Sequence, residues 1–566
     1  MKALLVAINA KYIHTNLAVY SLMKNAAEYK ESIELAEYTI NNQMDFIIRD
    51  IFERKPDVLL FSCYIWNIEY VKDAAREIHK VLPGTEIWFG GPEVSYDGLE
   101  FFDSVPYVKG IMIGEGEIVF SRLMGYYRDG DIELKDIEGL MYQQAGSVVI
   151  TKPCNACSMD DLQFVYDNMD AFSNKIIYYE SSRGCPFRCS YCMSSIDKTV
   201  RFRNMELVKK ELEFFLEKKV AQVKFIDRTF NVRVDRTMEI LEFLREHDNG
   251  ITNFHFEVAA DLITDEEIAL LNGMRPGLVQ LEIGVQSTNQ ETIGEIDRQM
   301  DFERVAKVAE AIRRPGNIHV HLDLIAGLPK EDMNSFIHSF NQVYALKPHE
   351  LQLGFLKVLK GAKMHDMAKE YGLIYQDKAP YEVLCTKWLG FEDVIRLKAV
   401  EEMLEVYYNS GLFPYTMEFL EAYFESAFAM YDSLATYYKE SHLLDLKHTR
   451  ITRYNILMDF IKSREGINYK DFSQILLFDL YLRENLKSRP DFACDMKEYK
   501  EAVGDAYRKC SEKVKSKILH IEPFHIDILQ LVEKKKISYR DCLIVFDYEN
   551  KHPVSRMAAV EEFVWQ

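Results

Sequence analysis

The pattern of apolar and polar positions divides the chain into three regions. The first, residues 1 to about 125, alternates short apolar segments with longer amphipathic ones such as NIEYVKDAAREIHKVL (67–82). Continuous apolar strands that alternate with helices predict a parallel sheet covered on both faces. We therefore expect a doubly wound α/β domain at residues 1–135, followed by a linker at 136–171. The expected strands are KALLVAIN (2–9), DVLLFSCY (57–64), EIWFGG (86–91) and GIMIGEG (110–116).

A ligand site in such a domain is expected at the carboxyl ends of the strands. Glycine at these ends lets a large ligand approach the backbone, but the same glycines could make tight turns, and the sequence leaves both interpretations open. The residues at the predicted strand ends are Asn9, Ser62, Gly90, Gly91, Gly114 and Gly116.

The second region, about 172 to 365, repeats the strand and helix rhythm six times. Successive right-handed βα units curl a parallel sheet into a full or partial barrel, whose active site lies at the carboxyl ends of its strands. We expect this barrel domain at residues 172–368. Its predicted strands are KIIYYESS (175–182), QVKFID (222–227), FHFEVA (254–259), LVQLEIGV (278–285), HVHLDLIAG (319–327) and LQLGFLKVL (351–359).

Three cysteines, Cys185, Cys189 and Cys192, follow the first barrel strand in the segment SSRGCPFRCSYCMSS (181–195). Three thiolates leave one position open, whereas a structural zinc site or a fully protein-ligated iron–sulfur cluster needs four ligands. The alternative is a zinc site completed by Cys154 or Cys157. Ten cysteines without a secretory signal do not indicate a disulfide framework, so clustered thiols indicate metal binding.

The motif RGCPFRCSYC, with Tyr191 before the third cysteine, resembles the cluster loop of radical S-adenosylmethionine (radical SAM) enzymes. The resemblance implies a partial (β/α)6 barrel and a 4Fe–4S cluster on Cys185, Cys189 and Cys192. It also implies that S-adenosylmethionine (SAM) chelates the open iron and is cleaved by an electron to a 5′-deoxyadenosyl radical.

The same resemblance implies a set of SAM-binding residues around the barrel. Asp227 would take the acidic role of a GGE-like turn whose glycines are absent here, and Arg298 would pair with the methionine carboxylate in a bidentate geometry. Glu257 and Asp323 lie on apolar strands, where a carboxylate is costly to bury without a partner. The full set is Tyr191, Asp227, Glu257, Gln286, Arg298 and Asp323.

The first region, with its GGPE and GEGE turns, resembles the cobalamin-binding domain of cobalamin-dependent radical SAM enzymes, which adds Glu117 to the candidate cobalamin contacts. The motif Asp-x-His-x-x-Gly, which supplies a histidine ligand to cobalt in other cobalamin enzymes, is absent. His14 has the wrong surroundings and is expected to be a polar residue of the first loop. A domain that no longer binds cobalamin is the alternative.

The third region, residues 369–566, is predicted to be mainly helical and resembles the C-terminal extensions that cap the barrel in this superfamily. It is rich in tyrosine and phenylalanine. An aromatic stripe at helical spacing is more often core than a ligand platform.

The composition indicates where the protein is located and which class of partner it does not bind. A hydrophobic fraction of 48% without a membrane-length apolar run and an N-terminus that reads as a buried strand indicate a cytoplasmic protein. A net charge of −20 argues against nonspecific binding of nucleic acid.

We therefore expect a radical methyltransferase in which cobalamin carries the methyl group to an organic substrate that the sequence does not identify. Flavodoxin or ferredoxin would supply the electron. The alternatives are a radical SAM enzyme that performs a rearrangement or cyclisation, with or without cobalamin, and a noncatalytic iron–sulfur sensor. A sensor would not need acidic and basic groups at successive strand ends.

Overall fold

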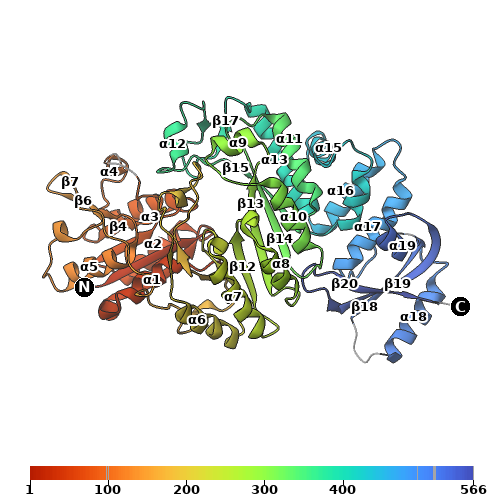
Figure 1. Cartoon of the computed structure of the whole chain (residues 1–566), viewed down its shortest axis with the longest axis horizontal. Helices are drawn as coiled ribbons and strands as arrows, with labels where there is room; N and C mark the ends of the chain where they lie inside the picture. Colours follow the sequence, from red (N-terminus) through yellow and green to blue (C-terminus); the bar gives the residue numbers. More distant parts are fainter. Residues whose placement is uncertain (97–98, 100, 494, 514–517, 565–566) are drawn as a thin grey trace.

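The structure is a computed structural model that describes residues 1–96, 99, 101–493, 495–513 and 518–564. Three parts follow one another along the long axis of the molecule (Figure 1). The N-terminal sheet domain lies at one end, the barrel in the middle, and helices with a small sheet at the C-terminal end. No helix among the described residues is long and apolar enough to cross a membrane.

The N-terminal domain is built on a sheet of order β2-β1-β3-β4-β5-β6-β7, whose first five strands are parallel. Side chains alternate along β1, so that Leu4 and Val6 pack with helices α2 and α3 while Leu5 packs with α5. The sheet is therefore covered on both faces, which confirms the doubly wound prediction. The elements are β1 (Ala3–Asn9), α1 (Leu17–Asn25), β2 (Ile33–Thr39), α2 (Met44–Arg54), β3 (Val58–Ser62), α3 (Ile68–Val81), β4 (Glu86–Gly90), α4 (Phe101–Ser104), β5 (Gly110–Met112), α5 (Gly116–Arg128), β6 (Leu140–Gln144) and β7 (Ser147–Ile150).

The hairpin β6–β7 lies inside the range predicted as a linker and adds two antiparallel strands to the sheet. Its turn is Ala145-Gly146, with φ of 50° and 79°, the left-handed conformation that two-residue hairpins require. Strand β6 pairs with the β5 edge through Leu140, Met141 and Tyr142, and β7 pairs with β6.

The central domain is a six-stranded open barrel of order β15-β14-β13-β12-β11-β8, and every neighbouring pair is parallel. Helices follow the strands as in successive βα units, which confirms the partial barrel. The barrel strands are β8 (Ile177–Tyr179), β11 (Gln222–Phe225), β12 (Asn253–Val258), β13 (Val279–Gln286), β14 (His319–Ala326) and β15 (Glu350–Phe355). The barrel helices are α6 (Met205–Glu217), α7 (Val234–Glu246), α8 (Asp265–Asn272), α9 (Gln290–Glu295), α10 (Phe302–Arg313) and α11 (Met333–Ala345), and the hairpin β9 (Ser182–Arg183) with β10 (Arg201–Phe202) flanks the cysteine loop.

Both open edges of the barrel are covered by the neighbouring domains. At the β8 edge, Ile176 donates its backbone N–H to the carbonyl of Ile13 at 2.8 Å, and its own carbonyl accepts from the Thr15 hydroxyl at 3.0 Å. At the β15 edge, the Asn409 side chain accepts from the N–H of Leu351 and donates to its carbonyl, both at 2.9 Å. Asn409 ends a single π-helical turn (Glu405–Asn409) that continues helix α13 (Phe391–Leu404).

The C-terminal region is mainly helical and ends in a three-stranded antiparallel sheet. Its aromatic residues form core, as their spacing predicts: Tyr407, Tyr431 and Tyr454 are fully buried. The remaining elements are α12 (Lys363–Met367), β16 (Ile374–Tyr375), β17 (Val383–Cys385), α14 (Pro414–Glu421), α15 (Ala427–Glu440), α16 (Arg450–Lys462), α17 (Tyr469–Arg483), α18 (Lys500–Lys513), β18 (Leu519–Ile526), α19 (Ile528–Lys534), β19 (Tyr539–Lys551) and β20 (Ala558–Phe563).

Candidate active site

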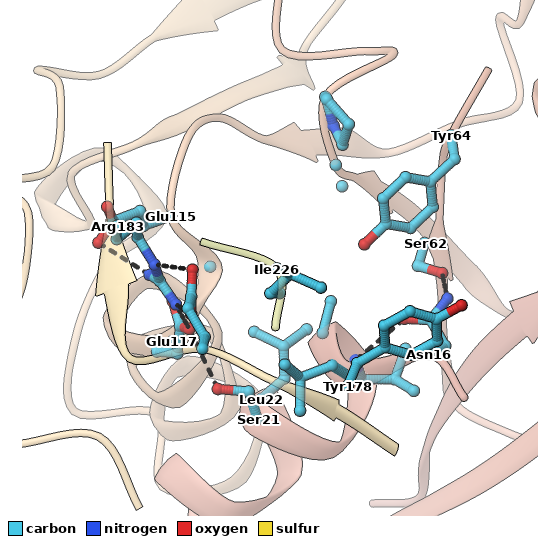
Figure 2. A pocket seen from close by; sticks show the side chains of 18 of the residues that line it. Asn16, Ser21, Leu22, Ser62, Tyr64, Glu115, Glu117, Tyr178, Arg183 and Ile226 are labelled. Carbon is cyan, nitrogen blue, oxygen red and sulfur yellow. Dashed lines mark hydrogen bonds and ion pairs between the residues drawn. The ribbon is translucent and has the colours of Figure 1, made fainter. Parts of the chain in front are cut away.

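A cavity of about 860 Å³ lies between the strand ends of the N-terminal sheet and the barrel. It is lined from both sides, by Ser62 and Tyr64 after β3 and by Tyr178 and Ile226 of the barrel (Figure 2). The seven residues that the sequence places at the cobalamin site all line it: Asn9, Ser62, Gly90, Gly91, Gly114, Gly116 and Glu117.

Two glycines of the strand ends differ in their surroundings, and a contact of either with a ligand stays a prediction. Gly91 has φ of +117°, and a Cβ there would lie 2.5 Å from the carbonyl oxygen of Cys63, so the turn itself requires glycine. Gly114 has φ of +79°, and a Cβ there would meet no atom within 4 Å. The backbone at Gly114 is therefore open to the cavity.

The polar residues of this rim hold the loops in place. The Asn9 amide donates to the carbonyl of His14 and to Glu37, both at 3.2 Å, and the Asn16 amide donates to the Ser62 hydroxyl at 2.9 Å. His14 Nδ1 lies 2.7 Å from the hydroxyl of Tyr178 on β8. His14 is a polar loop residue that links the N-terminal domain to the barrel.

Glu117 and its neighbour Glu115 are joined to the cluster loop by Arg183. The Arg183 guanidinium lies 3.1 Å from Glu115, 3.0 Å from Glu117 and 2.7 Å from Glu180, as the dashed lines to the first two show in Figure 2. Burial lowers the pKa of Arg183, but Glu180 and Glu117 outweigh it and raise that pKa well above its usual range. The GEGE turn is thus tied to a residue two positions before Cys185.

The side chains around the cysteine loop fit an iron–sulfur cluster that binds a polar ligand. Cys185 and Cys189 are buried, and Arg298 Nη1 lies 3.6 Å from Cys189 Sγ and 3.4 Å from the Tyr191 hydroxyl. Among the described residues, Arg298 Nε and Gln286 Oε1 are buried without a hydrogen-bond partner. Buried polar atoms normally have partners, so a bound polar molecule such as SAM fits here.

Gln286 also shows local backbone strain. Its φ is +71°, next to an irregularity in the pairing of β13 with β14 between Gly284 and Gln286. Such strain in a residue with a side chain is typical of functional sites. Gln286 and Arg298 both lie against Gly284, and Arg298 also reaches Cys189 and Tyr191. A contact of these residues with SAM stays a prediction.

Asp227 is placed differently from the others. Its carboxylate is 1% exposed and accepts from the Ser181 N–H at 2.7 Å, the Ser181 hydroxyl at 2.7 Å and the Ser182 hydroxyl at 2.6 Å. These bonds hold the strand end that leads into the cluster loop. A contact of Asp227 with SAM stays a prediction.

The inner face of the barrel carries a buried network of charges. Lys224 Nζ and His255 Nε2 each lie 3.0 Å from Glu282 Oε2. Burial alone would raise the pKa of Glu282, but His255 and Lys224 lower it to about 2. Burial and the charge of Glu282 raise the pKa of Glu257, which lines the cavity, to about 7.

Asp323 belongs to the same inner face. His321 Nε2 lies 2.9 Å from its Oδ1, and burial raises the pKa of Asp323 while His321 opposes that rise. Lys224, His255, Glu282 and His321 were missed in the sequence reading. His255, Glu282 and His321 lie two or four residues from a predicted site residue of the same strand, so strand alternation could have indicated them. Lys224 lies three residues from Asp227 and is not indicated in this way. Arg183 opens the motif RGCPFRCSYC, but the motif does not indicate its pairing with Glu115 and Glu117.

Comparison with known families matches three parts of the chain. Residues 179–343 match the model of the radical SAM superfamily, residues 3–124 match that of the B12 binding domain, and residues 369–546 match a model described as "Protein of unknown function (DUF4080)". The chain is a radical SAM protein with a B12-binding domain. Its cofactors are accordingly a 4Fe–4S cluster, SAM and cobalamin.

Two curated proteins similar to this radical SAM protein are methyltransferases by name. It is 26% identical over 390 residues to the cobalamin-dependent radical SAM methyltransferase TokK of Streptomyces tokunonensis. The aligned region covers 64% of this chain and 56% of TokK. It is 25% identical over 331 residues to the 2-(S-pantetheinyl)-carbapenam-3-carboxylate methyltransferase of Streptantibioticus cattleyicolor, and the aligned region covers 52% of this chain and 46% of that enzyme. The chain thus spans about half the length of the curated relatives it matches.

Solved structures share the fold of this radical SAM protein. The cobalamin-dependent radical enzyme OxsB with aqua-cobalamin bound superposes with a TM-score of 0.59 at 14% identity over 85% of this chain and 79% of OxsB. The methyltransferase TsrM from Kitasatospora setae, with cobalamin and a [4Fe-4S] cluster bound, gives 0.54 at 17% identity, over 66% and 76%.

Proposed function

We propose that this protein is a cobalamin-dependent radical SAM methyltransferase that acts in the cytoplasm on an organic substrate. One observation carries the proposal: a single cavity is lined by the glycine turns of the B12-binding domain and by Glu257 and Arg183 of the barrel. The cavity reaches the cluster loop at Gly184 and Met193, which are adjacent to Cys185 and Cys192, and Glu257 is the residue of the expected SAM set that lines it. The names of the curated relatives support methyl transfer as the reaction.

When bound, the reduced cluster with SAM supplies a radical that removes a hydrogen atom from the substrate, and cobalamin supplies the methyl group. We propose flavodoxin or ferredoxin as the electron donor. Cys185, Cys189 and Cys192 would hold three irons and leave the fourth open. The backbone at Gly114 would admit cobalamin close to the sheet.

The chain's own residues position these parts. Arg298 would meet the carboxylate of SAM beside Cys189, since its unpartnered Nε is available there. Arg183 fixes the distance between the B12-binding domain and the cluster loop through Glu115 and Glu117. Reacting groups that are held in register in this way need little reorganisation.

Anaerobic reconstitution with iron, sulfide and hydroxocobalamin tests the proposal. After desalting, absorbance spectra and metal analysis give the iron and cobalt content per chain, and incubation with SAM and dithionite gives the yield of 5′-deoxyadenosine. Retained cobalt together with SAM cleavage supports the proposal. A cluster that cleaves SAM without retained cobalt would exclude methyl transfer through cobalamin.

A further inference from the structure

Among the described residues that line the cavity between the two domains, one arginine has no ion pair. Three arginines line this cavity: Arg183, Arg203 and Arg228. Arg183 is paired with three carboxylates, and Arg203 lies 2.6 Å from Glu211. For Arg228, no hydrogen bond or ion pair of the guanidinium is found within the described ranges.

Arg228 lies at the end of the barrel where the active site is expected. It follows β11 at the carboxyl end of the strand, where barrel enzymes place their reacting groups. Its charge reaches both sides of the cavity: burial raises the pKa of Tyr64 to about 12 and that of Glu257 to about 7, and Arg228 opposes both rises. Arg228 thus faces the B12-binding domain as well as the barrel.

The backbone around Arg228 is fixed. Asp227 is held by three hydrogen bonds from Ser181 and Ser182. On the other side, Thr229 Oγ1 donates to the Arg228 carbonyl at 2.7 Å and lies 3.7 Å from Cys185 Sγ. The Asn231 side chain bonds both backbone groups of Ala259 at the end of β12.

Arg228 is therefore an exposed residue on a rigid loop. The next residue, Thr229, contacts the cluster cysteine Cys185. The chain has a net charge of −20, yet this arginine on a fixed backbone has no carboxylate partner among the described residues. It is therefore suited to bind an anionic ligand, because guanidinium binds carboxylate or phosphate with two parallel hydrogen bonds. SAM is assigned a different arginine, Arg298, which contacts the cysteine loop directly.

We infer that Arg228 binds an oxyanion of the substrate, a carboxylate or a phosphate, and so orients the substrate between the cluster and the B12-binding domain. This inference rests on the proposed function and names the substrate class: an organic anion. Arg228 would act as a binding residue, and its removal would weaken substrate binding without altering the cofactors.

The test measures the reactivity of Arg228 itself. Protein loaded with the cluster, cobalamin and SAM is treated with phenylglyoxal, an arginine reagent, and the modification rate of each arginine is followed by peptide mass spectrometry. The probes are inorganic phosphate and acetate, added separately. Arg233, which is exposed and paired with Asp235, is the internal control.

We expect Arg228 to react in the loaded protein and to be slowed by about tenfold or more by one of the two anions, whereas Arg233 is unaffected. Protection by phosphate alone indicates a phosphorylated substrate, and protection by acetate a carboxylate. In Arg228→Gln, SAM and cobalamin should bind with unchanged affinity in equilibrium dialysis.

Two results would overturn the inference. One is that loading with SAM or cobalamin alone protects Arg228, which would assign this arginine to a cofactor. The other is that neither anion slows the reaction. Both are read without turnover, so they are distinguishable from a failure of the proposed function, which would appear as absent cobalt or absent SAM cleavage.

Discussion

Arg183 Nη2 lies 3.0 Å from Glu117 Oε1, and this pair joins the cluster loop to the first helix turn after β5 of the B12-binding domain. Glu117 is buried, and it also accepts a hydrogen bond from the Ser21 hydroxyl at 3.1 Å. Arg183 thus joins the two domains beside the contacts of His14 with Tyr178 and of Ile13 and Thr15 with Ile176.

Replacement of Arg183 by glutamine should destabilise the protein. The substitution removes the cation that Glu117 and Glu180 share in a partly buried site, which costs about 3–5 kcal/mol, whereas Glu115 keeps its ion pair with Arg201. Thermal unfolding and limited proteolysis between the domains measure the effect. Arg233→Gln removes an exposed, solvent-screened pair with Asp235 and should unfold close to the wild-type temperature. Equal losses in the two variants would contradict the bridging role of Arg183.

Replacement of Cys189 by alanine should abolish the cluster. With one thiolate gone the iron–sulfur absorbance falls to background, and no 5′-deoxyadenosine is formed from SAM. Circular dichroism should show an intact fold. Cys385→Ala, in the distant strand β17, is the control and should retain the cluster and SAM cleavage. Retained cleavage in Cys189→Ala would refute the assignment of the cluster.

Replacement of Glu257 by glutamine should change how stability depends on pH. The folded-state pKa of Glu257 is about 7, above the ordinary value of 4.5, because burial and Glu282 favour the protonated form. The folded wild type therefore binds a proton more tightly than the unfolded chain, and this contribution is lost as the pH rises from 4.5 through 7.

Glutamine does not ionise, so Glu257→Gln should gain about 2–3 kcal/mol relative to wild type between pH 5 and pH 8. Urea unfolding of cofactor-free protein at both pH values measures this difference. The exposed Glu53→Gln is the control and should follow the wild type. A pH-independent difference for Glu257→Gln would show that this carboxylate keeps its ordinary pKa.

Replacement of Asn409 by alanine should loosen the β15 edge of the barrel. Both backbone groups of Leu351 lose their partner, which costs about 1–3 kcal/mol. Hydrogen exchange at the Leu351 amide should accelerate more than exchange in β12, the interior of the sheet. Asn41→Ala, on the exposed surface, is the matched control. Unchanged exchange at Leu351 would mean that the strand edge is stable without the asparagine.

The sequence predicts what depends on local pattern. Strand and helix periodicity predicted the six barrel strands and four of the seven strands of the N-terminal sheet, and the cysteine spacing identified the cluster loop. Strand β2, the hairpin β6–β7 and the small C-terminal sheet were missed. The glycine positions of the cavity followed from the rule on strand ends. The hydrogen bonds that Asp227 accepts could not be predicted, because the donors Ser181 and Ser182 lie 46 and 45 residues away along the chain. Long-range pairing also explains why the bridging role of Arg183 escaped sequence analysis.

The barrel is open, yet neither of its edge strands offers free backbone groups at Ile176 or Leu351, because Ile13 and Thr15 serve one edge and Asn409 the other. An uncovered strand edge is a template for pairing with another chain. Residues 172–368 expressed alone would expose both edges at once and should self-associate into aggregates. The flanking domains therefore act as built-in protection for the barrel as well as sites for ligands, and dissection of this protein into soluble parts should cut outside residues 13 and 409.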